Sequence, residues 1–563
     1  MSSMMWVQLT VFLGVLMLVG PSLGRIIAAI ATGERSSLLR WLGPVEGFVY
    51  RLTGVDAGRE MTWWQYCRTI LVANVVGVVV LVLLQQVQQW LPLNPDHAGR
   101  VPFLLSLNTA VSFVTNTNWQ AYAGETTLSH LTQMIGLGVQ NFLSAAAGMA
   151  VLFALARGIV RTETDKVGNA WADMTRSTIY ILLPLSVIVS ILLLGQGVIQ
   201  NFDATTQIAT AGSMEQMVPM GPAASQVAIK QLGSNGGGVF NANSAHPLEN
   251  PTPFSNLVEM LSLLLIPVAL VFAYGRMVND RRHGRILVAS LMALFVTFIG
   301  FSMWAEFSSN GAVGMTTAME GKEVRFGITN SILWSNATTA SSNGSVNAMH
   351  SSLSPVAGGL AMLNMMLGEV VFGGVGSGMY GLIVFILLTV FLAGLMVGRT
   401  PEYHGKQIGS FEIRMSMIAV LLPSTCIMVG AGLALATEAG RASMLHGGAH
   451  GVSEVLYAMA SAAGNNGSAF AGLDASKDFY TIVTSICMLV GRYGVIIPVL
   501  AIAGRMASKR KVPMGPGTFP TDTPIFGMLL LVVLLIIGAL TFFPVLSLGP
   551  IAEHLIMSTG GVQ

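Results

Sequence analysis

The feature that most constrains this chain is a series of ten long, predominantly apolar segments. A helix needs about 20 mostly apolar residues to cross the hydrocarbon core of a bilayer. The ten candidates are residues 4–24, 66–89, 131–156, 177–196, 256–275, 285–304, 355–398, 415–436, 479–503 and 525–545. The sequence therefore predicts an all-α polytopic membrane protein with about ten transmembrane helices.

The composition excludes several other classes of protein. Only 10% of the 563 residues are charged, whereas a soluble domain carries about 25%. So few charges argue against a soluble enzyme, a disordered chain and a nucleic-acid-binding protein. The net charge of +2 is too small to indicate a polyanionic partner, and the three cysteines are too far apart to indicate a disulfide framework or a metal cluster.

The distribution of basic residues indicates an orientation in the membrane. Of the 28 Lys and Arg residues, 20 lie in five loops and six lie in the alternate loops. The five basic loops are residues 25–64, 157–176, 276–285, 399–414 and 505–511. Because cytoplasmic loops carry an excess of Lys and Arg, we expect these loops to be cytoplasmic and both termini to be periplasmic. The first apolar segment has no basic region before it, so we expect an uncleaved anchor.

Four long loops on the opposite side share a cluster of Asn, Gly, Ser and Thr. The clusters are Thr115–Asn118, Gly233–Gly237, Ser341–Ser345 and Gly464–Ser468, and equivalent points are 118, 108 and 123 residues apart. Each cluster lies between two apolar segments. This internal repetition predicts four helix–pore-loop–helix repeats in a pseudo-fourfold arrangement, with one extra helix at each end. The expected boundaries are 1–63, 64–160 (repeat 1), 161–280 (repeat 2), 281–408 (repeat 3), 409–511 (repeat 4) and 512–563.

The repeated clusters have the composition expected of a filter for a monovalent cation. Backbone carbonyls can replace the water around such an ion without a fixed negative charge. Gly and Asn tolerate the backbone conformations that aim carbonyls at one axis, and a helix ending at each cluster would add partial negative charge. The expected filter residues are Thr115, Asn116, Thr117, Asn118, Ser234, Asn235, Gly236, Ser342, Asn343, Gly344, Asn465, Asn466 and Gly467.

Two simpler interpretations of these clusters remain open. An Asn-Gly pair is a common turn signal, and for a single loop a turn would be the better explanation. Asn336, Asn343 and Asn466 also fit the acceptor pattern for N-glycosylation. Four equivalent clusters at similar spacing favour the filter over a set of unrelated turns.

Three of the runs carry a family resemblance. Thr-Asn-Thr-Asn-Trp-Gln at 115–120, Gly-Gly-Gly-Val-Phe-Asn-Ala-Asn-Ser-Ala-His-Pro at 236–247 and Gly-Arg-Thr-Pro-Glu-Tyr at 398–403 resemble the A subunit of the bacterial Kdp potassium-transporting ATPase. That family belongs to a superfamily with the Trk, Ktr and HKT transporters. The resemblance covers essentially the whole chain and implies an inner-membrane protein with Gln120 near the filter.

The resemblance also implies a function and partners. The subunit would take K⁺ from the periplasmic side and pass it through an intramembrane tunnel to the P-type ATPase subunit KdpB, in a complex that also contains KdpC and the small KdpF. No partner besides these subunits and membrane lipid is implied. A self-sufficient channel or cotransporter of the Trk or Ktr kind is the alternative, although it would not require the extra terminal helices.

The chain itself carries no recognisable ATP-binding motif. There is no Gly-x-x-x-x-Gly-Lys-Ser/Thr sequence and no Asp-Lys-Thr-Gly-Thr phosphorylation segment. The Gly-rich stretch 373–378 also fails the dinucleotide pattern. We therefore expect K⁺ to be the ion transported, no nucleotide to bind this chain, and any ATP chemistry to come from another subunit.

Two polar positions within apolar segments are candidates for gating or steering the ion. Arg492 lies about 20 Å along its segment, where its charge would repel a cation moving on toward the cytoplasm. Snorkelling to the cytoplasmic interface is the alternative. Glu369 precedes a Gly-rich break at Gly373, Gly374, Gly376 and Gly378 in the seventh segment, which would act as a gate below the filter. A simple kink is the alternative for that break.

Overall fold

The computed structural model describes residues 3–34, 41–209, 215–308, 319–398, 400–512 and 519–559. Ten apolar helical stretches in this part of the chain are long enough to cross a membrane, as predicted. They are α1 (Ser3–Thr32), α3 (Trp63–Val87), η3 and α6 (Thr132–Gly138, Val139–Val160), α7, η4 and α8 (Ala170–Ser177, Thr178–Leu182, Leu183–Gly195), α10 (Pro253–Met277), α11 (Arg281–Phe307), α14 (Ser377–Val397), α15 (Ser410–Ala436), α18 (Asp478–Ala507), and α19, η7 and α20 (Pro524–Leu546, Ser547–Ile551, Ala552–Ser558).

Four further helices lie between these spans. They are α4 (Phe103–Val114), α9 (Ala223–Leu232), α12 (Gly327–Ala340) and α17 (Gly448–Gly464), and each ends at one of the Asn/Gly/Ser/Thr clusters. Every one follows a span and precedes another helix, which gives four helix–loop–helix units with α1 and α19 outside them. The element order therefore agrees with the predicted fold class.

The remaining elements are short. They are α2 (Gly43–Thr53), η2 (Gln88–Trp90), α5 (Gly124–Thr127), η5 (Asn243–Ala245), η6 (His350–Ser352), α13 (Pro355–Met366) and α16 (Glu438–Arg441). Three antiparallel pairs of strands join loops, namely β1–β2 (Met61–Thr62, Lys166–Gly168), β3–β4 (Thr206–Ala209, Glu215–Val218) and β5–β6 (Glu402–Tyr403, Lys406–Gln407). The regular secondary structure of the described residues is thus helical apart from these small pairs.

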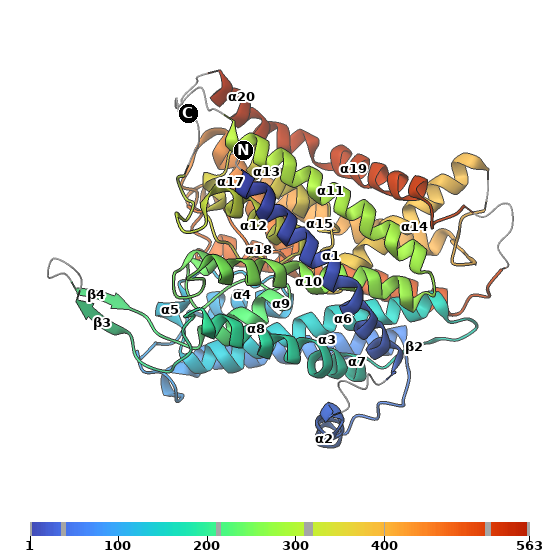
Figure 1. Ribbon diagram of the computed structural model, residues 1–563, viewed down its shortest axis with the longest axis horizontal. Helices are drawn as coiled ribbons and strands as arrows, with labels where there is room; N and C mark the ends of the chain where they lie inside the picture. The colour runs from blue at the N-terminus through green and yellow to red at the C-terminus, as the bar shows by residue number, and fades with distance from the viewer. Residues whose placement is uncertain are drawn as a thin grey trace.

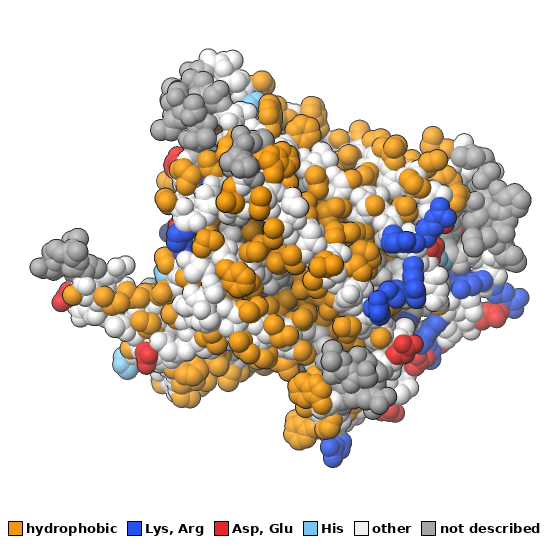
Figure 2. Space-filling view, viewed as in Figure 1, with side chains coloured by type: hydrophobic (Ala, Val, Ile, Leu, Met, Phe, Trp, Pro, Cys, Tyr) orange, Lys and Arg blue, Asp and Glu red, His pale blue; other side chains and the backbone are white. Residues whose placement is uncertain are grey.

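The molecule has two chemically different ends. The long helices run side by side across the view in Figure 1, with the β3–β4 hairpin projecting at one end and β2 at the other. Figure 2 shows that Lys and Arg side chains gather at the β2 end, while apolar side chains cover the middle. This separation is typical of a membrane protein whose basic end faces the cytoplasm.

The seventh segment is broken, but over a different range from the one predicted. Helix α13 ends at Met366, and α14 begins at Ser377. The break therefore covers residues 367–376 rather than 373–378; Gly378 is helical, and Glu369 lies inside the break rather than before it. Gly368, Glu369, Phe372, Gly373 and Gly376 all have positive φ angles, which no α-helix accommodates.

Small residues bring the central helices close together. A Cβ on Gly158 of α6 would meet the backbone of Ala503 on α18, and a Cβ on Gly24 of α1 would meet the backbone of Ala269 on α10. Such contacts are typical of helix packing within membranes, where small side chains allow backbones to approach. Helices α6 and α10 are the most enclosed spans, so the core lies around them.

Candidate functional site

The four clusters end their helices with the same backbone conformation. Asn116, Ser234, Ser342 and Asn465 follow α4, α9, α12 and α17, and their φ angles are 66°, 48°, 56° and 61°. A left-handed residue at the end of a helix turns the chain sharply away from the axis. The four positions are equivalent in the predicted repeats, which shows that the repetition extends to the backbone.

The next residue in each loop closes the turn with the same hydrogen bond. Its N–H donates to the carbonyl five residues earlier, which is the longer bond of the Schellman motif. The bonds join Thr117 to Ser112 (2.9 Å), Asn235 to Lys230 (2.8 Å), Asn343 to Thr338 (3.1 Å) and Asn466 to Ser461 (2.8 Å). All four loops therefore leave their helices along equivalent paths.

The four loops form a closed ring in which neighbours follow the order of the chain. A Cβ on Gly236 would meet the Asn343 carbonyl, one on Gly344 would meet the Asn466 carbonyl, and one on Gly467 would meet the Thr117 carbonyl. The first and second loops are joined by the Asn116 amide, which donates to the Ser234 carbonyl at 2.8 Å. Glycine is required at these contacts because the backbones touch.

Four equivalent carbonyl groups in this ring lack a donor. The carbonyl oxygens of Thr117, Asn235, Asn343 and Asn466 accept no hydrogen bond from any residue in the described part of the chain, although all four residues are fully buried. Buried carbonyls are normally paired because an unpaired one is costly. Four unpaired oxygens at equivalent positions of one ring can serve as ligands for a cation.

The side-chain amides face the supporting structure instead. Asn343 Nδ2 donates to the Lys230 carbonyl at 3.2 Å, and Asn466 Nδ2 donates to the Thr338 carbonyl at 2.9 Å. Each amide thus binds the carbonyl that closes the turn of the preceding loop. These side chains fix the spacing of neighbouring loops and leave the backbone oxygens as the available ligands.

The first loop departs from the fourfold pattern. Asn118 has a side chain where the other loops have Gly236, Gly344 and Gly467, and its φ angle is 58°. Its amide donates to Asn141 at 2.5 Å, and its side-chain oxygen accepts from Asn235 at 3.2 Å. The ring is therefore closed but not symmetrical.

Gln120 lies beside the ring. Its side-chain oxygen accepts a 2.8 Å hydrogen bond from the Gly238 N–H, and a Cβ on Gly237 would also meet this oxygen. Gln120 therefore links the first loop to the second. Arg399 of the third family-like run lies outside the described residues.

A buried ion pair behind the second loop was not predicted. The ammonium group of Lys230 donates to Glu249 at 2.6 Å and to the Gly237 carbonyl at 2.8 Å, and both charged side chains are fully buried. A lone lysine inside an otherwise uncharged pore helix was the available signal. Lys322 and Glu306 form a comparable pair at 2.6 Å near the third loop.

A chain of hydrogen bonds supports the fourth loop from behind. Asn466 Oδ1 accepts from the Ser468 hydroxyl at 2.5 Å, and that hydroxyl contacts the Tyr457 hydroxyl at 2.9 Å. The same tyrosine hydroxyl lies 2.7 Å from His350 Nδ1. Burial lowers the pKa of His350 to about 4, so its ring is neutral at ordinary pH. The chain therefore holds the loop without placing a charge behind it.

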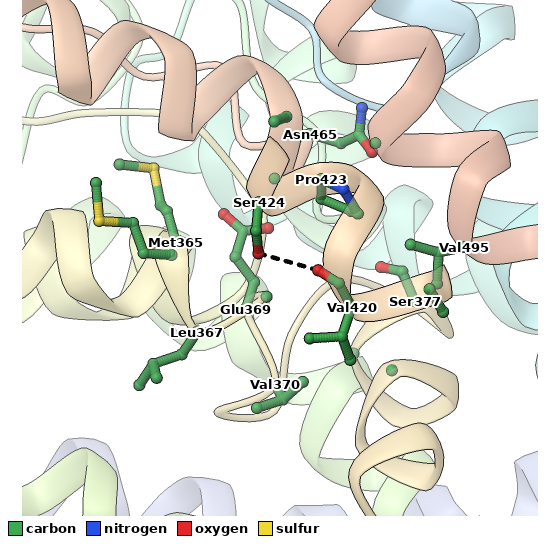
Figure 3. Close-up of a pocket in the computed structure, with 18 of the residues that line it drawn as sticks. Met365, Leu367, Glu369, Val370, Ser377, Val420, Pro423, Ser424, Asn465 and Val495 are labelled. Carbon is green, nitrogen blue, oxygen red and sulfur yellow. Dashed lines mark hydrogen bonds between the residues drawn. The ribbon is translucent and has the colours of Figure 1, made fainter. Parts of the chain in front are cut away.

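A cavity of about 90 Å³ lies next to the ring. Asn116, Ser342 and Asn465, the left-handed residues of three loops, contribute to its lining together with Glu369 and Arg492. Figure 3 shows the Glu369 side chain in this cavity beside Ser424. The two predicted steering residues and three of the four loops therefore share one cavity within the helical bundle.

Glu369 and Arg492 differ in their partners. Neither carboxylate oxygen of Glu369 has a hydrogen bond within 3.5 Å to another described residue. The side chain of Asn466 lies nearby. Arg492 is buried and donates to the Ser144 carbonyl at 2.8 Å, with no acidic group within 4 Å in the described part of the chain. Arg492 thus lines the cavity and does not extend to the cytoplasmic interface.

The broken segment packs directly against the ring. The Gly373 N–H donates to the Ala340 carbonyl at the end of α12 (2.8 Å), and a Cβ on Gly374 would meet the side chain of Ser342. A Cβ on Gly376 would meet the backbone of Gly148 on α6, and one on Gly378 would meet Phe372. The break therefore fills the space between the third loop and α6, with no room for larger side chains.

Comparison with known proteins gives consistent results. Residues 10–555 match the family model for the potassium-transporting ATPase A subunit (KdpA). The potassium-transporting ATPase potassium-binding subunits of Sorangium cellulosum and Herpetosiphon aurantiacus are 53% and 51% identical to this chain, covering 98% of it and 99% of their own lengths. The potassium transporter TrkH from Vibrio parahaemolyticus is similar in fold, with a TM-score of 0.52, 14% identity, and coverage of 88% of this chain and 98% of TrkH.

Proposed function

The chain belongs to the family of potassium-transporting ATPase A subunits, and from that premise we propose that it captures K⁺ in the ring of four loops. The observation that carries the proposal is the set of buried carbonyls at Thr117, Asn235, Asn343 and Asn466, which accept no hydrogen bond from the residues that the structure describes. Backbone oxygens replace the hydration shell of K⁺ without adding a fixed charge. The ion would enter from the side of the β3–β4 hairpin.

Several features around the ring favour a monovalent cation. The C-terminal ends of α4, α9, α12 and α17 meet at the ring, so each helix contributes partial negative charge there. The described residues contain no group of three or more His, Cys, Asp or Glu side chains arranged for a metal ion. A site of neutral oxygens suits a weakly charged, easily dehydrated ion better than a divalent one.

The cavity next to the ring supplies the next step in the proposed pathway. An ion leaving the ring would meet Glu369, which can attract it, and Arg492, which repels it from the cytoplasmic side. The ion would then move sideways through an intramembrane tunnel, with the break at 367–376 as a gate. This chain would supply no ATP chemistry; a P-type ATPase subunit (KdpB), together with KdpC and KdpF, would complete the pump.

The proposed setting is the bacterial inner membrane with both termini periplasmic. Ten crossings return the chain to the side on which it starts, and the basic end of the molecule then faces the cytoplasm. The pore repeats would comprise residues 64–160, 161–280, 281–408 and 409–511. The extra spans α1 and α19 would stand outside the four repeats.

Replacing a ring glycine tests the capture site. Gly344→Ala introduces a Cβ where the Asn466 carbonyl lies, at a φ angle of 77°, and should raise the KM for K⁺ of the assembled complex and reduce its discrimination against Na⁺. Gly432→Ala on α15, where a Cβ meets nothing within 4 Å, is the control and should change neither property. If Gly344→Ala left both properties at the wild-type value in a complex of normal abundance, the ring would not be the selective site.

A second experiment distinguishes a pump subunit from a self-sufficient transporter. The second function is the alternative because the fold is similar to that of the potassium transporter TrkH. The full chain is purified from its native membrane in mild detergent. K⁺-stimulated ATP hydrolysis by a co-purifying P-type ATPase is expected. K⁺ flux through vesicles containing this chain alone would instead support the channel or cotransporter.

A further inference from the structure

The short helix α2, between the spans α1 and α3, has one strongly apolar exposed face. Trp41, just before the helix, and Val45, Phe48 and Leu52 within it are separated by four, three and four residues. That spacing places all four side chains on one side of a helix. Their exposed fractions are 70%, 43%, 59% and 75%. The described part of the chain therefore leaves a continuous apolar stripe uncovered.

The opposite face of α2 is fixed to the transmembrane bundle. Glu46 is buried, and its carboxylate accepts hydrogen bonds from Arg176 (2.9 Å), Tyr180 (2.6 Å) and Tyr50 (2.9 Å). Burial alone would raise the pKa of Glu46, but these hydrogen bonds and the charge of Arg176 lower it. Because Arg176 and Tyr180 belong to the span that begins at α7, the carboxylate sets both the position and the rotation of α2.

The direction of α2 differs from that of the spans. In Figure 1 its ribbon is seen nearly end-on, whereas α3, α6 and α8 run across the picture. It lies outside the bundle, beside α7, and does not extend past the basic end of the molecule. A helix that crosses the direction of the spans runs parallel to the plane of a membrane. Figure 2 shows the apolar side chains at this position.

We propose that α2 is an interfacial helix whose Trp41, Val45, Phe48 and Leu52 side chains insert into the lipid of the cytoplasmic leaflet. The orientation rests on the proposed function, since the basic loops must face the cytoplasm. Amphipathic helices that lie in the membrane plane bury their apolar face at the boundary between headgroups and acyl chains. Trp41 has the side chain enriched at that depth, and Arg51 in the last turn is exposed on the basic side.

Lipid fits this face better than a protein partner for two reasons. The stripe is one side chain wide and convex, and the span against which α2 rests also exposes apolar side chains, such as Val187 and Ile188 on α8. The Glu46 carboxylate also holds the helix against the bundle at a fixed position along the neighbouring span. A docking site for a protein would be expected to offer a broader surface with polar groups at its rim.

Fluorescence quenching by lipid tests this proposal. The assembled complex carrying Phe48→Cys, Leu52→Cys or Thr53→Cys is labelled with a small fluorophore and reconstituted into vesicles of phosphatidylethanolamine and phosphatidylglycerol containing bromine-labelled acyl chains. The unsubstituted complex corrects for the native cysteines. Labels at residues 48 and 52 should be quenched several-fold more by the brominated lipid than the label at Thr53, an exposed polar position on the same helix.

Two outcomes would overturn the proposal. Strong quenching of the residue 48 and 52 labels by aqueous iodide would show that the stripe faces water. Protection from both quenchers would show that another protein covers it. Neither outcome depends on K⁺ capture, so failure here is distinguishable from failure of the Gly344→Ala test.

Discussion

The side-chain amide of Asn466 in the fourth loop donates a 2.9 Å hydrogen bond to the Thr338 carbonyl of the third repeat. The same carbonyl accepts the Asn343 N–H that closes the third loop. One oxygen therefore holds two neighbouring loops at once. Asn343 repeats this arrangement by binding the Lys230 carbonyl, which closes the second loop.

Asn466→Ala should widen the ring on the side of the third loop. The substitution also removes the bonds that Asn466 Oδ1 accepts from Ser468, but those lie within the fourth loop, and only the bond to Thr338 joins two loops. Loss of that one bond costs about 1 kcal/mol, so we expect the KM for K⁺ to rise at least about fivefold, since 1.4 kcal/mol corresponds to about tenfold. The measurement is K⁺-stimulated ATP hydrolysis by the assembled complex. Asn330→Ala is a matched control, because Asn330 lies on α12, the pore helix that carries Thr338, and among the described residues its amide donates only to the Phe326 carbonyl just before that helix. Equal effects of the two substitutions would refute a specific role for the link between loops.

Lys230→Met should reduce the amount of folded protein. The substitution leaves the fully buried Glu249 without its 2.6 Å partner, and breaking a buried ion pair costs about 3–5 kcal/mol. The amount of complex in the membrane after expression is the measurement. Lys477→Met removes a partner from an exposed pair with Asp474 and should have no effect.

The double substitution Lys230→Met with Glu249→Gln separates folding from ion binding. Because it leaves no buried charge unpaired, it should recover most of the lost abundance. The Gly237 carbonyl still lacks its 2.8 Å donor, so the KM for K⁺ should remain raised. Recovery of both abundance and KM would mean that Lys230 has only a structural role.

Arg492→Gln should increase ATP-independent leakage of K⁺. Two like unit charges about 7 Å apart repel each other by about 2 kcal/mol at an effective dielectric constant of about 20, which sets the scale of the repulsion between Arg492 and a cation in the cavity. Its removal should therefore raise Rb⁺ efflux from vesicles about tenfold or more. The substitution removes the hydrogen bond to the Ser144 carbonyl, which costs about 1 kcal/mol, but it leaves no buried acidic partner unpaired, so the complex should still fold. Arg505→Gln, an exposed arginine on the same helix, should leave efflux unchanged.

The contact between α20 and the fourth pore helix should weaken as the pH rises. The hydrogen bond to Glu553 raises the pKa of His450, and the two groups are 2.8 Å apart. A group with a raised pKa stabilises the folded state fully below its ordinary value of about 6.5 and loses this effect as the pH passes through the raised pKa. Hydrogen-exchange protection of residues 552–558 should therefore decrease from about pH 6 to about pH 9.

Three variants assign this pH dependence. His450→Gln should abolish it, whereas His554→Gln, at an exposed position of α20, should preserve it. His446 lies next to His450 and binds Glu454 at 2.9 Å, so His446→Gln tests a contribution from the second ring. A dependence that persisted in His450→Gln would place the titrating group elsewhere.

The spans could be predicted from the sequence because apolar length alone decides them. The helices extend several residues beyond the predicted apolar segments. Helix α18, for example, continues to Ala507, because residues near a membrane surface can remain helical without being apolar. The four loops could be located because their clusters recur in order. The left-handed turn could be predicted at Asn116 and Asn465, because Asn tolerates that conformation. It could not be predicted at Ser234 and Ser342, where only the contacts of the ring impose it.

Other features depend on contacts between distant residues. The break in the seventh segment starts at Leu367, six residues before Gly373. Its path depends on packing against the third loop and α6, which the local sequence does not reveal. The pairing of Lys230 with Glu249 spans a loop of irregular structure, and no local pattern predicts it. The anchoring of α2 by Glu46 joins residues 130 positions apart.

The closed contact order of the four loops has a mechanical consequence. Each glycine rests against the carbonyl of the following loop, and the fourth rests against the first. No loop can retreat from the axis without releasing its neighbour, so the aperture should dilate as a single unit instead of opening at one corner. Discrimination between ions of different radius would then be a property of the whole circumference, and a substitution in any one repeat would change the geometry of the other three.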